Sequence, residues 1–211
     1  MSHSVIADEL PRSEKVYAAA ARATAFFMKD ADVHRTLIKL AQVLEADAIP
    51  YALVGALALS EYGYERVTAD VDLLMTHDGL ARFKQKHLGR GYLEKFPGSR
   101  GVRDTETGVT IDVVLSGDYP GDGLPKPVSF PDPATVATRS GSLWLLPLNK
   151  LIELKLASGL SAAHRLKDLA DVLELIRMVQ IPLELGLQLD ASVRVKFEEL
   201  WHAARAASDE E

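Results

Sequence analysis

Residues 51–75 read YALVGALALSEYGYERVTADVDLLM, and this stretch decides the fold. Its first four residues form an apolar run that ends at Gly55, which predicts a short buried strand. A helix is expected next, over residues 56–62, and Gly63 is expected to end it in the left-handed conformation. A strand, a glycine and a helix therefore follow one another directly.

The second half of this stretch, residues 65–75, is predicted to form another strand. Alternate side chains of a strand share a face, so its polar residues are expected together on the side away from the core. These polar residues are Arg66, Thr68, Asp70 and Asp72. A further strand is predicted over residues 109–115, where Asp112 stands among β-branched and apolar residues.

Three carboxylates, Asp70, Asp72 and Asp112, are the candidate metal ligands. Aspartate is disfavoured in strands, and carboxylates a few ångströms apart repel one another unless a cation neutralises them. Mg²⁺ prefers oxygen ligands and is usually held by one or two carboxylates together with substrate phosphates. The pattern therefore favours phosphoryl or nucleotidyl transfer that depends on Mg²⁺ or Mn²⁺. The alternative interpretation is that these carboxylates are solvated charges on exposed strands.

The rest of the chain is interpreted from apolar periodicity and from helix-capping residues. The expected elements are helices over residues 13–27, 32–46, 79–87 (with Asp78 as N-cap), 147–157, 164–179 and 191–207, a strand over 92–96, and loops around Arg100 and Arg103 and over 117–133. Three parts follow from this order: an N-terminal helical segment (1–30), an α/β (α+β) core (31–146) and a C-terminal helical region (147–211).

Composition limits the function further. The chain has 211 residues, 24 basic and 30 acidic, so its formal net charge of −6 requires any polyanionic partner to be held locally. It has no cysteine, which excludes disulfides, Cys-ligated zinc and thiol nucleophiles. No apolar run reaches the roughly 20 residues of a membrane span, and the first residues lack a secretory pattern. We therefore expect a cytoplasmic protein with no membrane partner.

The order Leu53-Val54-Gly55-Ala56, thirteen further residues, and Asp70-Val71-Asp72-Leu73-Leu74 resembles the signature of the DNA polymerase β-type nucleotidyltransferase superfamily. Within it, the chain is most similar to the small bacterial AbiEii-like and minimal nucleotidyltransferases. The resemblance implies a nucleotidyltransferase fold, with a mixed β-sheet flanked by helices, and a catalytic metal triad of Asp70, Asp72 and Asp112.

The same resemblance implies an enzyme that transfers a nucleoside monophosphate from a nucleoside triphosphate to an acceptor hydroxyl. The acceptor would be RNA such as tRNA, a protein or a small molecule, and the protein would belong to a toxin–antitoxin pair. The implied nucleotide-binding residues are Gly55, Ala56, Arg66, Thr68, Lys155 and Lys167.

Several alternatives stay open at the level of sequence. The family usually has Gly or Ser where this chain has Ala56, which favours a catalytically weak or inactive nucleotide-binding regulatory partner on the same fold. Gly55 also fits a plain strand-to-helix turn, and Arg66 could pair with Asp70 rather than with phosphate. The spacings Arg165/Asp168 and Lys167/Asp171 also suit ordinary ion pairs on a helix surface. A helical interaction protein with incidental acidic residues is the third possibility.

Overall fold

The computed structural model describes residues 31–208, and the predicted helix over residues 13–27 lies outside this range. The described chain begins with a helix over residues 31–46, as expected. The elements that follow are β1 (Tyr51–Val54), α2 (Gly55–Glu61), β2 (Asp70–Met75), α3 (His77–His87), β3 (Tyr92–Glu94), β4 (Val102–Asp104), β5 (Thr110–Leu115), α4 (Pro133–Val136), β6 (Thr138–Ser140), β7 (Leu143–Leu145), α5 (Leu148–Ser161), α6 (Leu166–Val179) and α7 (Ala191–Ser208). Two short 3₁₀ turns, Ala163–Arg165 and Leu183–Gln188, join the last three helices.

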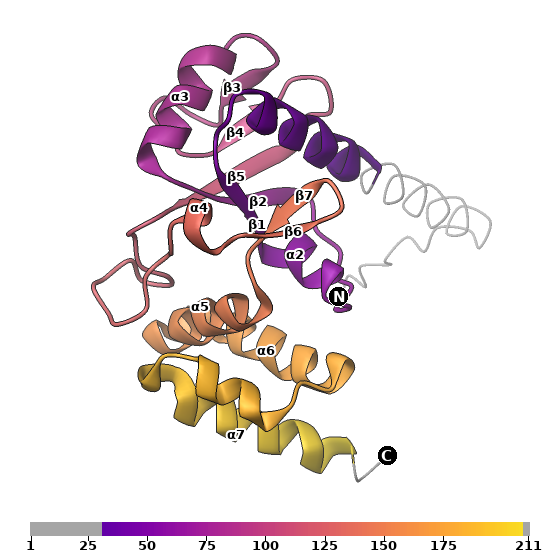
Figure 1. The fold of residues 1–211 in the computed structure, drawn as a ribbon, viewed down its shortest axis with the longest axis vertical. Coiled ribbons are helices and arrows are strands. Elements are labelled where there is room, and N and C mark those ends of the chain that lie inside the picture. The colour runs from indigo at the N-terminus through magenta and orange to yellow at the C-terminus, as the bar shows by residue number, and fades with distance from the viewer. Residues whose placement is uncertain (1–30, 209–211) are drawn as a thin grey trace, which may run out of the picture.

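The strands form one mixed seven-stranded sheet in the order β3-β4-β5-β2-β1-β7-β6. Two neighbouring pairs, β2–β5 and β1–β7, are parallel, and the other pairs are antiparallel. The three C-terminal helices stack below the sheet-bearing part in Figure 1. The predicted α/β architecture, with a mixed sheet flanked by helices and a helical C-terminal region, is confirmed.

Burial explains why the central strands take these positions. All four residues of β1 are buried, which fits its place between β2 and β7. Every second side chain is buried in β5 and in the first half of β2, where Val71 and Ile111 are only 0–1% exposed, and the last three residues of β2 are all buried. The partly buried positions between them carry the aspartates. Apolar burial on one face of these strands therefore directs the carboxylates to the other face.

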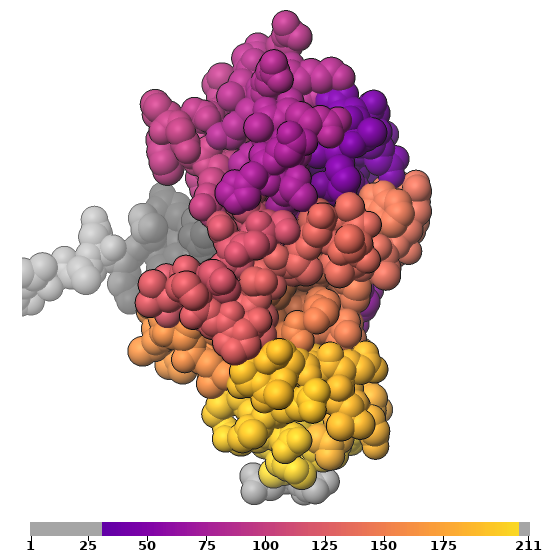
Figure 2. Space-filling model, turned by 60° about the vertical axis from the view of Figure 1, so that its left-hand side comes forward, coloured from indigo at the N-terminus to yellow at the C-terminus, as the bar shows by residue number. Residues whose placement is uncertain are grey.

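The helices cover the sheet through specific contacts. The helix over residues 31–46 packs on β4, where Lys39 Nζ lies 3.0 Å from Oδ2 of the buried Asp104. In α3, the ring of Phe83 meets that of Tyr92 edge to face, with centroids 5.0 Å apart. The segment over residues 117–132, drawn in rose in Figure 2, reaches the helical part, and Asp122 N donates to Ser161 Oγ at 3.2 Å. This segment therefore bridges the sheet and α5.

Some local predictions were wrong. Residues 65–69 are not part of a strand, because β2 begins only at Asp70, where its pairing with β5 starts. Thr76, not Asp78, caps α3, and its Oγ1 accepts a hydrogen bond from Gly79 N at 3.0 Å. Arg103 lies in strand β4 instead of a loop.

The strands β4, β6 and β7 were not predicted from the sequence. Each is three residues long, which is too short to display an alternating pattern, and each forms by pairing with a longer neighbour or with a hairpin partner. Tertiary pairing, rather than local sequence, therefore sets the edges of the sheet. Within residues 31–208, no helix is long and apolar enough to cross a membrane.

Candidate active site

The acidic residues of two distant stretches meet on one face of the sheet. The strands β2 and β5 are parallel neighbours, and Asp72 stands directly opposite Asp112 in their register. Asp70 lies two residues earlier on the same face of β2, opposite Thr110. The register therefore puts the three aspartates on one face of the sheet, while their roles as shared metal ligands and catalytic residues stay a prediction.

Asp72 has the most perturbed electrostatic environment of the three carboxylates. Burial and then the negative charges of Asp112 and Asp70 raise its pKa from 3.8 to about 6, against the opposing effect of Lys155 and Arg66. No residue in the described part of the chain donates a hydrogen bond to this carboxylate. A positive charge bound here would therefore be strongly favoured.

Asp112 is held by a cation of its own chain. Lys95 Nζ donates to Asp112 Oδ1 at 2.8 Å, and both side chains are about two-fifths exposed. A Cβ at Gly101 would lie 2.7 Å from the Lys95 side chain and 2.8 Å from this oxygen, so a larger residue there would have to displace the pair. Across residues 31–208, no three His, Cys, Asp or Glu side chains are gathered as a ready-made metal site.

Gly55 brings the start of α2 against Asp72. Its φ of +66° lies in the left-handed region, and a Cβ there would overlap the Asp72 carboxylate, 2.8 Å from its Cγ. Glycine is therefore required here both by conformation and by space. The strand-to-helix turn expected at Gly55 is present, and Ala56 follows it as a buried residue.

A network of ion pairs around the buried carboxylates Asp168 and Asp171 joins the site to the C-terminal helices. Asp171 accepts from Arg66 Nη1 at 2.6 Å and from Lys155 Nζ at 2.7 Å. Asp168 accepts from Ser158 Oγ at 2.6 Å and lies 2.6 Å from Arg165 Nη2. Burial opposes ionisation of Asp168, but the charges of Lys155 and Arg165 and the Ser158 hydrogen bond together lower its pKa. These carboxylates hold the cations at the edge of the acidic face.

A cavity of about 290 Å³ lies between this face and the helices. We call it the acidic cleft. Its wall includes Asp72 and five of the other residues predicted for the site, but Asp70, Asp112 and Thr68 do not line it. The residues that decide its chemistry are Gly55, Ala56, Arg66, Asp72, Lys155, Arg165, Lys167, Asp168 and Asp171.

Two expectations about the cations and one about Thr68 need correction. Arg66 pairs with Asp171, and neither it nor Thr68 lies on β2, because that strand starts four residues after Arg66. Thr68 Oγ1 donates to the backbone oxygen of Asp70 at 3.3 Å, which is a local turn contact. The Arg165–Asp168 pair is present, whereas Asp171 pairs with Arg66 and Lys155, and Lys167 is exposed.

Sequence reasoning missed one participant, Lys95, and one pairing, Arg66 with Asp171. Lys95 carried no signal, because a lysine in a short strand-and-turn segment is usually a solvated charge. The partnership of Arg66 with Asp171 spans 105 residues, so no local pattern could reveal it. The Asp168/Asp171 spacing on α6 was a usable signal, since three residues apart on a helix places both carboxylates on one side.

No known protein family and no curated protein sequence matches the chain. A crystal structure of ANT(2″)-Ia in complex with adenylyl-2″-tobramycin is similar over 85% of this chain and 99% of that chain, with 12% identity and a TM-score of 0.46. A solution structure of the antibiotic-resistance factor ANT(2″)-Ia is similar over 82% of this chain and 92% of that chain, with 13% identity and a TM-score of 0.42. At such identities and scores, neither likeness bears on the activity of this chain.

Proposed function

We propose that this protein is a metal-dependent nucleotidyltransferase that transfers a nucleoside monophosphate from a nucleoside triphosphate to an acceptor hydroxyl. The observation that carries the proposal is the register of β2 and β5, which puts Asp72 directly opposite Asp112. Because the two carboxylates repel each other, the pair favours a divalent cation over an unoccupied state. The arginine and lysine side chains that line the acidic cleft carry the positive charge that phosphate binding requires.

The donor set fits Mg²⁺ or Mn²⁺ that arrives with the substrate phosphates. Asp72 offers a partly buried carboxylate whose pKa is raised first by burial and then by the negative charges of Asp112 and Asp70, which lie on the same face. Since Mg²⁺ is usually held by one or two carboxylates plus phosphate oxygens, a cluster of three protein ligands is not needed. When bound, the ion would neutralise phosphate charge and brace the leaving pyrophosphate.

Side chains of the protein would bind the phosphates and accept the proton of the acceptor hydroxyl. Lys155, Arg165 and the exposed Lys167 line the cleft and would bind phosphate oxygens. Asp112 would accept the proton of the acceptor hydroxyl, once its ion pair with Lys95 opens. Most of the rate enhancement would come from alignment and charge neutralisation.

The acceptor class follows from the resemblance alone and is proposed in that form: an RNA such as tRNA, a protein, or a small molecule. We also propose that the protein acts as an AbiEii-like member of a toxin–antitoxin pair. A catalytically weak nucleotide-binding regulator is the second candidate. It is favoured by the Lys95–Asp112 ion pair, which occupies the proposed base, and by the absence of a hydroxyl at Ala56.

Label transfer separates these candidates. The full chain is incubated with each α-³²P-labelled nucleoside triphosphate, Mg²⁺, and total RNA or total protein, and transfer is followed on denaturing gels. We expect label on one acceptor class, lost with EDTA. Asp112→Asn should reduce transfer about 10²- to 10⁴-fold, the usual worth of general base catalysis, while nucleotide affinity changes little.

Asp78→Asn is the matched control, because Asp78 is an exposed carboxylate on α3 whose nearest cation, Arg82, is 3.9 Å away. Its transfer rate should equal that of the wild type. Metal-dependent nucleotide binding without transfer would favour the regulator. Wild-type rates in Asp112→Asn would remove Asp112 from the mechanism.

A further inference from the structure

A second and larger cavity, of about 510 Å³, lies at the other end of β1 from Gly55. It sits where the helix over residues 31–46 ends, beside α4 and the β6–β7 hairpin, and we call it the aromatic pocket. It shares no lining residue with the acidic cleft. Its volume falls within the range typical of small-molecule sites.

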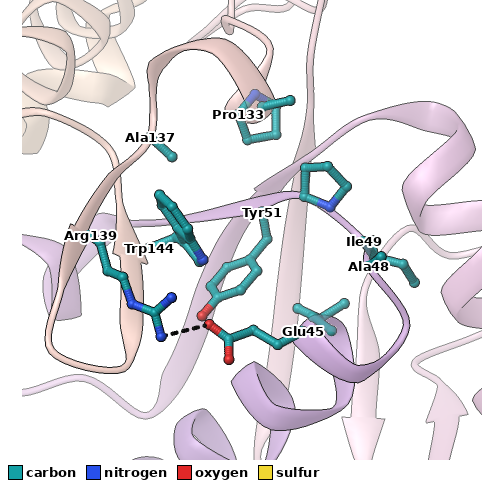
Figure 3. A pocket seen from close by; sticks show the side chains of 11 residues that line it. Glu45, Ala48, Ile49, Tyr51, Pro133, Ala137, Arg139 and Trp144 are labelled. Atoms are coloured by element: carbon teal, nitrogen blue, oxygen red, sulfur yellow. Dashed lines mark ion pairs between the residues drawn. The ribbon is translucent and has the colours of Figure 1, made fainter.

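Aromatic and aliphatic groups form most of its wall (Figure 3). The rings of Tyr51 and Trp144 stand on one side, and Ile49, Pro133 and Ala137 complete the apolar surface. Such walls offer flat faces and little hydrogen bonding. They therefore suit a flat ring more than a flexible or highly solvated molecule.

Two charged groups face each other at one edge of the aromatic pocket. Arg139 Nη2 lies 3.4 Å from Glu45 Oε1, and the two side chains are 53% and 39% exposed. The Arg139 guanidinium also lies 5.6 Å from the centre of the Trp144 ring. A donor and an acceptor are thus presented side by side, next to an aromatic face.

The Tyr51 hydroxyl is the unexplained group of the pocket. Tyr51 is only 2% exposed, and within residues 31–208 its hydroxyl, although close to the Trp144 backbone, forms no hydrogen bond of normal geometry. Buried polar groups normally have a partner, because an unpaired one costs stability. Burial also raises the pKa of this phenol, so it remains a hydrogen-bond donor at neutral pH.

We propose that the aromatic pocket is a second ligand site that binds a flat heteroaromatic ring carrying a hydrogen-bond donor and acceptor side by side, the chemistry of a nucleobase. The ring would lie along the partly exposed Trp144, and its polar edge would meet Glu45 and Arg139. Because the Tyr51 hydroxyl is buried, side chains of the pocket wall must shift for the base to reach it, and the hydroxyl would then gain the partner that it lacks in the free protein. This site is independent of nucleotidyl transfer in the acidic cleft.

Free nucleosides are the probe, because they carry the base but none of the phosphates that the acidic cleft would hold. The chain has two tryptophans, so a Trp201→Phe variant leaves Trp144 as the only indole. Adenosine, guanosine, cytidine and uridine are titrated to millimolar concentration, and Trp144 fluorescence is recorded. Equilibrium dialysis of the unaltered chain gives an independent affinity. We expect saturable quenching by at least one nucleoside.

Two tyrosine variants test the assignment. Tyr51→Phe should weaken nucleoside binding about fivefold to tenfold through loss of one hydrogen bond, and yet raise the urea midpoint, because an unpaired buried hydroxyl disappears. Tyr92→Phe is the matched control, since Tyr92 also has a buried hydroxyl without a partner in the described residues but lies outside the pocket. It should raise the midpoint and leave binding unchanged.

Ala137→Trp fills the pocket and should abolish binding in dialysis. If that variant fails to fold, the comparison of Tyr51→Phe with Tyr92→Phe still decides. The proposal is overturned if no nucleoside binds saturably, or if Tyr51→Phe binds as tightly as the wild type. Neither outcome affects label transfer at the acidic cleft, so the two proposals fail separately.

Discussion

At the scale of single residues, Gly55 restricts the acidic site most tightly. Its left-handed backbone costs roughly 1–2 kcal/mol for a residue with a Cβ, and any Cβ would also displace Asp72. We expect Gly55→Ala to lower the free energy of unfolding by more than about 2 kcal/mol and to slow transfer, because the carboxylate must move. Urea denaturation and the label-transfer assay measure the two effects.

Gly89→Ala supplies the comparison for this prediction. Gly89 has a similar φ of +74°, but no atom lies within 4 Å of the position that its Cβ would take. Its loss of stability should therefore be only the backbone cost, about 1–2 kcal/mol, with no change in transfer. Equal losses in the two variants would mean that crowding against Asp72 plays no part.

At the scale of elements, the α5–α6 pair is joined to the sheet-bearing part through Asp171. This carboxylate is 4% exposed and accepts hydrogen bonds from Lys155 of α5 and from Arg66, which lies between α2 and β2. We expect Asp171→Asn to lower the free energy of unfolding by about 3 kcal/mol, because two partly buried cations lose their counter-charge. Thermal and urea denaturation provide the measurement.

Glu174→Gln, on the same helix, is the control for Asp171→Asn. Glu174 is 41% exposed in its side chain and lies 3.6 Å from Arg177, so its loss should cost no more than about 1 kcal/mol. A similarly small effect in Asp171→Asn would show that the network contributes charge to the cleft but little to the cohesion of the helices.

At the scale of the whole molecule, the raised pKa of Asp72 makes stability depend on pH. The folded chain binds this proton more tightly than the unfolded chain, so protonation stabilises the fold. That stabilisation is complete below about pH 4 and is lost as the pH rises through about 6. At pH 7 the ionised carboxylate therefore costs about 3 kcal/mol relative to its protonated form.

Asp72→Asn should remove this dependence. The difference in unfolding free energy between Asp72→Asn and the wild type should change by up to about 3 kcal/mol in favour of the variant between pH 4 and pH 7. Urea denaturation at several pH values measures it. Asp78→Asn, which removes an exposed carboxylate, is measured at the same pH values for comparison. A constant difference for Asp72→Asn would contradict the assigned pKa.

The longer helices and the strands β2 and β5 were predictable from the sequence, because each is long enough to show its own periodicity. The strand β1 was predictable as an apolar run, and the four-residue α4 was not predicted. Alternation fixed the faces of Asp72 and Asp112 within their own strands, whereas their meeting was implied by the family resemblance and depends on the pairing of β2 with β5. The partner of Arg66 was not, because ion pairs across 105 residues follow from packing alone. The aromatic pocket was not predictable from the sequence either, because Trp144 lies on the three-residue strand β7, which forms only by pairing with β1 and β6.

The parallel pairing of β1 with β7 has a consequence for synthesis on the ribosome. Leu53 can pair with Leu145 only after strands β2 to β6 and the segment over residues 117–132 have been synthesised. Until then one side of β1 is an open edge of apolar residues, which invites pairing with other nascent chains. Truncation before β7 should therefore yield insoluble protein, even though every proposed metal ligand would be present.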